Sequence, residues 1–464
     1  MGSPRGVPLL RWGKLRRKGK ERPRRVVFIG LDGTPYTFMQ RLIAEGRMPN
    51  AARLAQCGSL LRMDSVWPWV SSVAWSSMMT GVNPAKHNIF GFIDRDPATY
   101  KQFIPTSRNM KAKTLWEVLS EAGKRVIVVN VPVTYPPRQV NGILVGCFLS
   151  PSLEKAVYPP SYLPTLKSLG YIVDVDPWKA RESKDLALQE VNAALDARLR
   201  TLFYLFDHEE WDYLHVHVME TDRLHHFLWQ QMAEGHPIYA PAFYAVYKRI
   251  DDMLALLASK LDEDTTLMWM ADHGFCTIKK EVYVNRWLMD NGWLKLRNVP
   301  PDRNKGLDEI APSSVAYSLD PGRVVIRVRG REKEGCVAPG AEYDAIRDQI
   351  SAAALQLHDP DSGEPIFQAV FRREEIYHGP YLEQAADLIL APYDGYDPKG
   401  PLYKETLTHK GDELVGMHTF DDAMLYVGGR SVPPTRFSVL DVMPTILELM
   451  NVPQPPELDG RSLV

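Results

Sequence analysis

Short apolar runs alternate with amphipathic stretches from residue 25 to about residue 275. The runs are rich in Val, Ile, Leu and Met and have the length of strands buried on both faces. They cover 25–31, 125–131, 213–218 and 266–271. Helical periodicity predicts the intervening helices over 36–46, 114–122, 185–207 and 240–261. This alternation predicts an α/β fold: a doubly wound, mostly parallel sheet with helices on both faces.

The pattern changes after residue 280. Residues 281–410 mix short strands, such as 323–329, with a helix near 341–356 and with many Gly and Pro residues. We interpret this segment as an inserted α+β cap. The core resumes with a strand at 423–427 and a closing helix at 438–450. The predicted organisation is a basic tail (1–24), the first part of the core (25–280), the cap (281–410) and the C-terminal part of the core (411–464).

Composition narrows the class of protein. The chain has 464 residues and is 45% hydrophobic, which is too apolar for a disordered protein. No apolar run reaches the ~18 residues that a membrane span needs, so we expect no integral membrane segment. The four cysteines lie far apart without a CxxC pair, which excludes a disulfide framework or a structural Cys-zinc site and favours a reducing, cytoplasmic location. They are Cys57, Cys147, Cys276 and Cys336.

The net charge of -2 hides an asymmetry. Residues 1–25 hold ten Lys or Arg and one acid, Glu21, so the remainder of the chain is acidic. The tail has no apolar stretch or small-residue cleavage site and is not predicted to be a secretory signal. A solvated, disordered tail is the favoured interpretation, and weak contact with anionic lipid or nucleic acid is the alternative.

Acidic and histidine side chains recur where the predicted strands end. They are Asp32, Asp222, His226, Asp272, His273 and His418. Asp222 and His226 are four residues apart and share one face of a helical turn. Taken singly, Asp32 is explained as a helix cap and His226 as a packed histidine. Together, three carboxylates and three imidazoles suit two divalent cations, and the nitrogen ligands favour Zn²⁺, or Mn²⁺, over Mg²⁺.

A candidate nucleophile lies in the segment 67–81, where Ser71 and Ser72 precede a helix-like stretch. A serine hydroxyl is a weak nucleophile until a base or a metal activates it, and a helix N-terminus favours a bound anion. The alternative is that either serine only caps the helix.

These residues, in this order, resemble the alkaline phosphatase superfamily. The similarity is to its type I phosphodiesterase/nucleotide pyrophosphatase branch, and within it to a prokaryotic group described as predicted phosphohydrolases or phosphomutases. It spans about residues 25–464. The matching stretches are Gly30–Gly33, Ala74–Trp75, Thr80–Pro84, His87–Phe90, Thr221–Phe227, Ala271–Phe275, Leu440–Thr445 and Asp459–Arg461.

The resemblance implies roles for the site residues. One metal is expected at Asp222, His226 and His418, and the other at Asp32, Asp272 and His273. Ser71 takes the place of the nucleophile, which also contacts the metals and is more often Thr in this group. His409 is the alternative to His418.

Two residues depart from the family's pattern. Asn88 replaces a Gly, which the turn tolerates because Asn adopts positive φ. Phe92 replaces an Asn that helps to hold the phosphoryl oxygens.

The implied activity is a two-metal hydrolase that cleaves small-molecule phosphate esters, most of all phosphodiesters or nucleotide-type pyrophosphates, through a phospho-Ser intermediate. A phosphomonoesterase or phosphomutase uses the same site. A sulfatase needs a C/S-x-P-x-R motif, which Ser71–Trp75 lacks, and a non-catalytic binding module need not keep every ligand. Lys86 and Arg223 are candidate substrate contacts, while His215, His217 and His225 are expected to be packed around the site. The basic side chains of 327–331 and 372–373 are expected on a solvated face.

Overall fold

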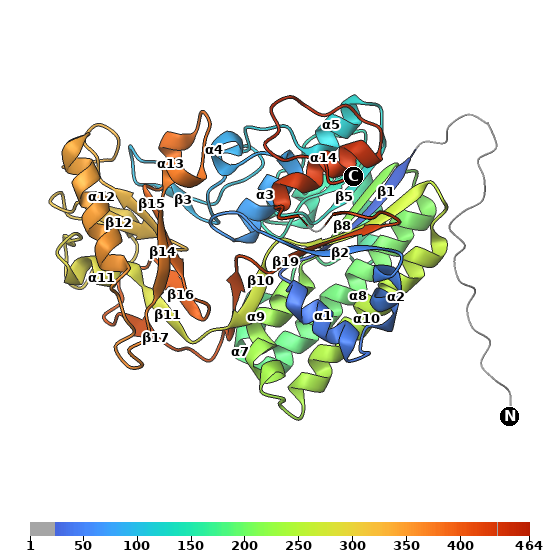
Figure 1. Cartoon of the computed structure of the whole chain (residues 1–464), viewed down its shortest axis with the longest axis horizontal. Helices are drawn as coiled ribbons and strands as arrows, with labels where there is room; N and C mark the ends of the chain where they lie inside the picture. Colours follow the sequence, from blue (N-terminus) through green and yellow to red (C-terminus); the bar gives the residue numbers. More distant parts are fainter. Residues whose placement is uncertain (1–23, 434) are drawn as a thin grey trace.

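A computed structural model describes residues 24–433 and 435–464 (Figure 1). Its centre is an eight-stranded sheet in the order β2-β19-β9-β1-β8-β5-β6-β7. Strands β9, β1, β8, β5 and β6 run parallel, whereas β19 and β7 are antiparallel to their neighbours. The bounds are β1 Arg25–Leu31, β2 Gly58–Met63, β5 Val126–Val129, β6 Gly142–Val145, β7 Val157–Tyr158, β8 Tyr213–Val218, β9 Thr265–Ala271 and β19 Ala423–Gly428.

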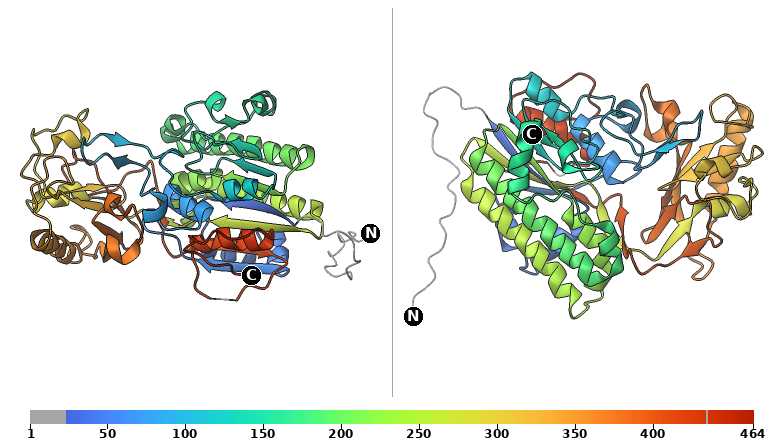
Figure 2. Two further views of the ribbon diagram at one scale, coloured as in Figure 1. Left: turned by 90° about the horizontal axis from the view of Figure 1, so that it is seen from above. Right: turned by 180° about the vertical axis from the view of Figure 1, so that it is seen from behind.

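Helices cover both faces of this sheet (Figure 2). Side chains alternate across each strand, so Val27 and Ile29 of β1 pack on one face while Val26 and Phe28 pack on the other. The first face carries α1 Tyr36–Ala44, α2 Pro49–Ala55, α8 Lys184–His208, α9 Glu220–Ala233 and α10 Tyr239–Lys260. The second carries α3 Ser71–Thr80, α5 Leu115–Glu121 and α14 Val442–Leu449. The predicted doubly wound, mostly parallel α/β fold is confirmed.

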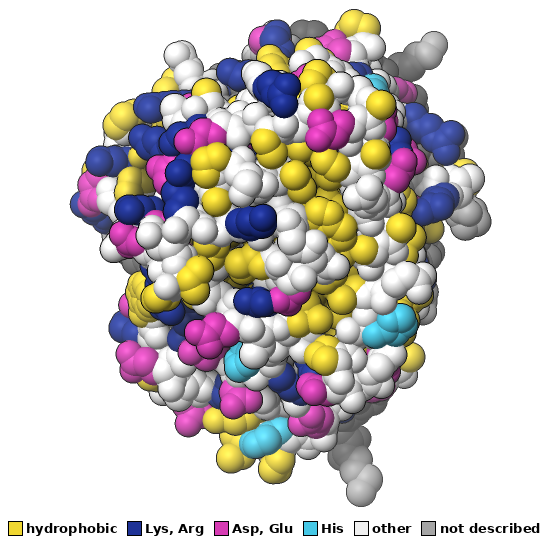
Figure 3. All heavy atoms as spheres, turned by 90° about the vertical axis from the view of Figure 1, so that its left-hand side faces the viewer, with side chains coloured by type: hydrophobic (Ala, Val, Ile, Leu, Met, Phe, Trp, Pro, Cys, Tyr) yellow, Lys and Arg dark blue, Asp and Glu magenta, His cyan; other side chains and the backbone are white. Residues whose placement is uncertain are grey.

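Residues 281–410 pack around an apolar cluster that includes Val324, Ile326 and Leu388 and that Tyr100 joins. They form most of the left-hand end of the molecule in Figure 1, a face on which acidic and basic side chains mix around apolar ones (Figure 3). One sheet has the order β12-β13-β15-β14 and another β16-β11-β17. The elements are β11 Lys280–Tyr283, α11 Val284–Asp290, β12 Ala316–Leu319, β13 Arg323–Ile326, α12 Ala341–Ala354, β14 Phe367–Arg372, α13 Arg373–Ile376, β15 Leu388–Pro392, β16 Tyr396–Lys399 and β17 Thr408–His409. The division of the chain into core and inserted cap stays a prediction.

Buried polar contacts join this region to the segment that follows α3. The hairpin of β3 (Asp94–Arg95) and β4 (Gln102–Phe103) reaches it through Arg95, whose Nη2 lies 2.7 Å from Glu332 Oε1. The expectation of a solvated basic face is wrong for Arg373, which is buried, and for Arg327. Its buried guanidinium donates to Tyr100 Oη at 2.8 Å and to Ser314 O at 2.8 Å. Buried arginines with several acceptors hold the region together.

The shorter elements complete the chain. They are α4 Pro84–His87, α6 Leu163–Ser168, α7 Pro177–Glu182, β10 Gly274–Thr277 and β18 Gly416–Thr419. The predicted basic tail lies outside the described residues except for Arg24. Within residues 24–433 and 435–464, no helix has the length and apolarity to cross a membrane.

Candidate active site

Three neighbouring strands of the central sheet end at the same edge. In the order β9-β1-β8, the register pairs Gly30 with Met270 on one side and Leu31 with Val218 on the other. Asp32 therefore follows β1 beside the residues that follow β9 and β8. Parallel strands carry their functional groups at the carboxyl edge, because all of those ends meet there. Asp272 and His273 extend from β9, and Asp222 lies in the first turn of α9 after β8.

Asp222, His226 and His418 form the first of two groups. His418 Nε2 lies 3.2 Å from Asp222 Oδ1 and 3.0 Å from His226 Nε2. His226 Nε2 lies 3.4 Å from Asp222 Oδ1. Tetrahedral ligands at Zn–N or Zn–O distances of about 2.0 Å are separated by about 3.3 Å. These three atoms therefore have the spacing of one metal's ligands.

Asp32, Asp272 and His273 form the second group and are fully buried. His273 Nε2 lies 3.5 Å from Asp32 Oδ1 and 3.5 Å from Asp272 Oδ2. The His273 ring stacks on that of His418 with 3.7 Å between centroids, so the two groups adjoin. Ligand atoms of Asp222, His273 and His418 also lie within 4.8 Å of one another.

Backbone carbonyls fix the orientation of the three histidines. The Nδ1 atoms of His226, His273 and His418 lie 2.8 Å from Gly416 O, 3.0 Å from Gly274 O and 3.3 Å from Trp69 O, respectively. A carbonyl only accepts, so each Nδ1 is the donor and each Nε2 keeps its lone pair toward the carboxylates. Metal-binding histidines have this arrangement, in which the second nitrogen is tied to an acceptor.

Electrostatics at the site favour bound cations. Burial lowers the pKa of His226 to about 4 and that of His273 to about 3, so both rings are neutral at pH 7, as metal ligands must be. Burial and the charge of Asp32 raise the pKa of Asp272, whose Oδ2 is buried without a hydrogen-bond partner. The residues thus fit two divalent ions, which would neutralise the crowded carboxylates and occupy the unpartnered atom.

Further groups surround Asp32. Its Oδ2 accepts a hydrogen bond from Trp75 Nε1 at 3.0 Å and lies 2.9 Å from His217 Nε2. Burial opposes ionisation of Asp32, but His217 and His273 favour it, and the pKa of Asp32 is lowered. His225 lies between Gly33 O at 3.0 Å and Tyr247 Oη at 2.7 Å, and His215 Nδ1 lies 3.1 Å from Tyr213 Oη. These three histidines are packed around the site, as expected.

Gly33 shapes the turn that carries Asp32. Its φ of +62° is a left-handed conformation, and a Cβ there would lie 3.0 Å from His273 Cε1. Its N–H donates to Asp272 Oδ1 at 3.2 Å. Only glycine adopts this positive φ and leaves room for His273 without strain. The hydrogen bond from Gly33 N to Asp272 connects the second group to the end of β1.

Ser71 is the first residue of α3 and lies beside the second group. Its Oγ lies 3.2 Å from Asp32 Oδ1 and 3.3 Å from His273 Nε2. Ser72 Oγ is buried and makes no hydrogen bond. Since the first N–H groups of a helix lack intrahelical acceptors, the start of α3 also suits an anion beside the hydroxyl.

A cavity of about 240 Å³ opens onto Ser71 and the first group. Its lining residues are Ser71, Phe92, Phe148, Met219, Asp222, Arg223, His226 and His418. Of the two predicted substrate contacts, only Arg223 lines it, because Lys86 forms an ion pair with Asp459. Phe148 has no sequence signal and was missed; it meets Phe92 edge-on with 6.0 Å between ring centroids.

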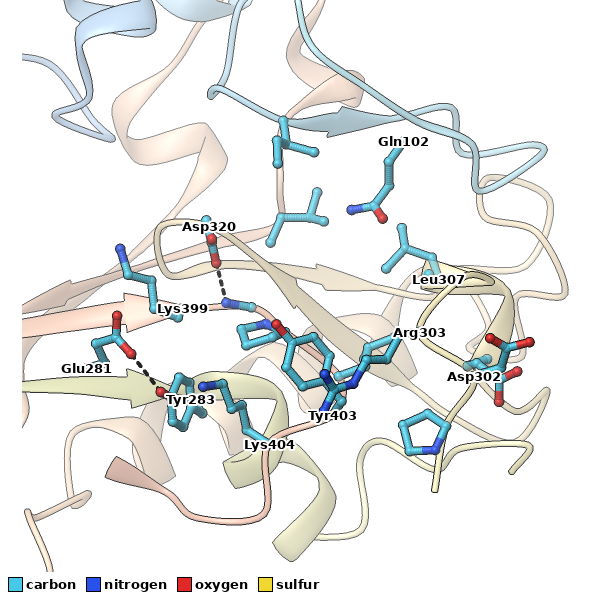
Figure 4. Close-up of a pocket in the computed structure, with 18 of the residues that line it drawn as sticks. Gln102, Glu281, Tyr283, Asp302, Arg303, Leu307, Asp320, Lys399, Tyr403 and Lys404 are labelled. Carbon is cyan, nitrogen blue, oxygen red and sulfur yellow. Dashed lines mark hydrogen bonds between the residues drawn. The ribbon is translucent and has the colours of Figure 1, made fainter. Parts of the chain in front are cut away.

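A larger cavity of about 570 Å³ lies elsewhere, between the β3–β4 hairpin and residues 281–404 (Figure 4). Two of its acidic side chains already accept hydrogen bonds from neighbouring residues: Tyr283 Oη donates to Glu281 at 2.6 Å, and Gly400 N donates to Asp320. Among the described residues that line it there is no histidine. The candidate chemistry therefore belongs to the smaller cavity.

The two histidines that the sequence offers as alternative metal ligands, His418 and His409, lie in different places. His418 stands on β18 opposite Phe275 of β10, within the first group. His409 lies on β17, pairs with Glu281 and is exposed. Asn88 adopts φ +66°, so the expectation that it takes a positive φ is confirmed.

Comparison with known proteins identifies the family and the fold of the chain. Residues 26–421 match the family model described as Type I phosphodiesterase / nucleotide pyrophosphatase. Phosphonoacetate hydrolase from Sinorhizobium meliloti 1021 is similar in structure, with a TM-score of 0.62, 18% identity, and coverage of 93% of this chain and 96% of that chain. Murine ectonucleotide pyrophosphatase / phosphodiesterase 5 has a TM-score of 0.55 and 14% identity, covering 93% of this chain and 96% of that chain. At these identities the structures establish a shared alkaline phosphatase-like fold.

The family match spans most of the chain and agrees with the two adjoining ligand groups at the carboxyl edge of the sheet. The chain belongs to the type I phosphodiesterase/nucleotide pyrophosphatase family of alkaline phosphatase superfamily hydrolases.

Proposed function

We propose that the protein hydrolyses phosphate esters, foremost phosphodiesters or nucleotide-type pyrophosphates, with two divalent ions and a covalent phospho-Ser71 intermediate. The observation that carries this proposal is the position of Ser71 Oγ, 3.2 Å from Asp32 Oδ1 and 3.3 Å from His273 Nε2, at a cavity also lined by the first ligand group. A nucleophile that contacts the second group, and that lines the same cavity as the first group, can attack a phosphoryl group held between the two.

Each residue has a role in this proposal. Asp222, His226 and His418 hold one ion, and Asp32, Asp272 and His273 hold the other. When bound, the ions would polarise the phosphoryl oxygens and lower the pKa of the hydroxyl. The start of α3 stabilises negative charge on the transferring group.

The chemistry has two displacements. In the first, Ser71 Oγ forms a bond to phosphorus as the bond to the leaving oxygen breaks, and the leaving oxygen takes up a proton in place of the one that the hydroxyl loses. In the second, the oxygen of a water molecule forms a bond to phosphorus, the bond to Ser71 Oγ breaks, and Ser71 Oγ takes up a proton in place of the one that the water loses. Zn²⁺ is the proposed metal and Mn²⁺ the alternative. A structure of murine ectonucleotide pyrophosphatase / phosphodiesterase 5 is described as an inactive variant in complex with AMP, which supports a nucleotide-type ester as one of the first substrates to test.

Stereochemistry tests the covalent route. Each in-line displacement inverts phosphorus, so two of them retain its configuration. We expect net retention with a chiral thiophosphate diester and a phosphoryl group on the Ser71 peptide after acid quenching. Inversion, with no labelled peptide, would reassign Ser71 to positioning. A parallel screen of metal-reconstituted enzyme with phosphate, phosphonate and sulfate esters tests the ester class itself, and turnover of sulfate esters alone would contradict the proposal.

A further inference from the structure

Arg223 is a permanent cation at the candidate metal centre. Among the described residues that line the 240 Å³ cavity, it alone is a Lys or Arg. It directly follows Asp222 in the first turn of α9, and Nη1 lies 3.3 Å from Asp222 Oδ2. Asp222 presents its other oxygen, Oδ1, to His226 and His418. Arg223 therefore borders the same cavity as those ligands and Ser71.

The side chain is held in place before any substrate arrives. Nε donates to Asp174 Oδ1 at 3.2 Å and Nη2 donates to Asp174 Oδ2 at 2.6 Å. The segment that carries Asp174 is itself fixed, because buried Arg198 donates from Nη2 to Val173 O at 2.9 Å. On the other side, Arg223 Cζ lies 5.2 Å from the ring centroid of Phe148. A cation fixed in this way loses little entropy when it binds a ligand.

Binding capacity remains after these contacts. A guanidinium has more N–H groups than the bonds to Asp174 and Asp222 use. Because Arg223 lines the cavity, its remaining donors are available to an anionic oxygen there. Arginine binds phosphate and carboxylate oxygens with strong, charge-assisted hydrogen bonds.

We propose that Arg223 binds an anionic oxygen that a simple phosphodiester lacks, and so directs the enzyme toward esters with an additional negative charge. A diester carries one charge on its two non-bridging oxygens. The additional charge is either the third oxygen of a phosphate monoester or an oxygen of a neighbouring phosphoryl group, as in a pyrophosphate. This inference rests on the proposed function, since it names the substrate class of that same site.

Substrates that differ in one anionic oxygen test this inference. 4-Nitrophenyl phosphate and methyl 4-nitrophenyl phosphate share a leaving group, but only the former has the third anionic oxygen. ATP, attacked at its α phosphorus, supplies the charge from neighbouring phosphoryl groups. The variants are Arg223→Met and Arg223→Lys. Lys86→Met is the matched control, because it removes an equal charge beside a family motif but outside the cavity.

We expect Arg223→Met to lower kcat/KM for 4-nitrophenyl phosphate or for ATP roughly ten- to a hundredfold more than for the methyl diester, as the loss of one charge-assisted hydrogen bond implies. The more affected substrate identifies the source of the charge. Arg223→Lys should restore part of the difference, and Lys86→Met should affect all three substrates equally. Metal content should match that of wild-type protein.

Three results would overturn the inference: an equal loss for all substrates, a wild-type enzyme that turns over only the methyl diester, or loss of a metal ion from Arg223→Met. The last result would make Arg223 a positioning residue for Asp222. Absence of wild-type activity on every ester with Zn²⁺ or Mn²⁺ would instead contradict the proposed function, so the two failures are distinguishable.

Discussion

His418 offers the most decisive test of the metal centre, because the chain contains a matched control. His418→Ala removes one of three nitrogen or oxygen atoms that lie 3.0 to 3.4 Å apart. His409→Ala removes an exposed histidine nine positions earlier, on β17. We expect about two ions per chain in wild-type protein and in His409→Ala, and about one in His418→Ala, since Asp222 and His226 alone leave a tetrahedral ion without its third protein ligand.

The magnitude can be worked out for stability. An ion that binds only the folded protein stabilises it by about 2.7 kcal/mol when its free concentration is 100 times Kd. His418→Ala should lose the part of the Zn²⁺ stabilisation that comes from the ion of the first group. It should also lose the stacking on His273, where the centroids lie 3.7 Å apart, which is worth about 0.5–1.5 kcal/mol. The second loss persists without metal, so denaturation with and without a chelator separates the two.

The assay combines elemental analysis of dialysed protein with urea denaturation in Zn²⁺ or chelator. X-ray absorption of the zinc-loaded protein should give ligand distances of about 2.0–2.1 Å. A His418→Ala variant that keeps both ions, or a His409→Ala variant that loses one, would refute the assignment of His418. A chelated wild-type enzyme that keeps full activity would refute the metal requirement itself.

Further predictions concern the nucleophile, the β1 turn and a buried histidine. Ser71→Ala should lower kcat by about 10³-fold or more with metal content unchanged, while Ser72→Ala should have a much smaller effect; the reverse ranking would show that the nucleophile is misplaced by one residue. Gly33→Ala should destabilise the protein by about 1 kcal/mol or more and weaken metal binding. The control is Gly46→Ala, which also has a positive φ of +70° but no atom within 4 Å of the added Cβ, so it should show the cost of the backbone conformation alone. Equal effects of the two substitutions would contradict a role for the contact with His273. Burial lowers the pKa of His87 from 6.5 to about 3, and its Nδ1 accepts from Ile89 N at 3.1 Å. Below pH 6.5 the unfolded chain therefore takes up a proton at His87 that the folded protein does not, and the free energy of unfolding falls by up to about 1.4 kcal/mol per pH unit. His87→Asn should make this dependence on pH shallower. Urea denaturation at several pH values measures it, and a dependence equal to that of wild-type protein would contradict the prediction.

The elements of the core could be predicted because each bears its pattern locally. The strand over 213–218 coincides with β8, and the helices predicted over 185–207 and 240–261 differ from α8 and α10 by one residue at each end. Long periodic segments encode their own structure. β6 was missed because its four residues carry little pattern, and β2 was missed because this edge strand is only partly buried and mixes Gly, Ser and Arg with its apolar residues. The antiparallel direction of β19 was also missed, since direction depends on which strand becomes its neighbour.

The candidate site was predictable in composition but not in geometry. Asp32, Asp222 and Asp272 are recognisable because polar residues follow apolar strands, and the family resemblance supplies their grouping. The choice between His418 and His409 depends on a pairing between β10 and β18, which are separated by more than a hundred residues. Likewise, Phe148 lines the cavity because the chain after β6 brings its ring against Arg223 of α9, a contact between residues distant in the chain.

The alternation of strands and helices can be read from the sequence. So can the edge at which the carboxylates gather, because buried parallel strands must present their polar residues at the carboxyl ends. Three features depend on the folded chain: β9, β1 and β8 are neighbours, three imidazole Nδ1 atoms face backbone carbonyls, and Arg223 rather than Lys86 lines the cavity. The two sets of features differ in how far apart in the chain the interacting residues lie. Periodicity and strand-end chemistry act over a few residues, whereas strand order, carbonyl partners and ion-pair choice arise from contacts between segments distant in the chain.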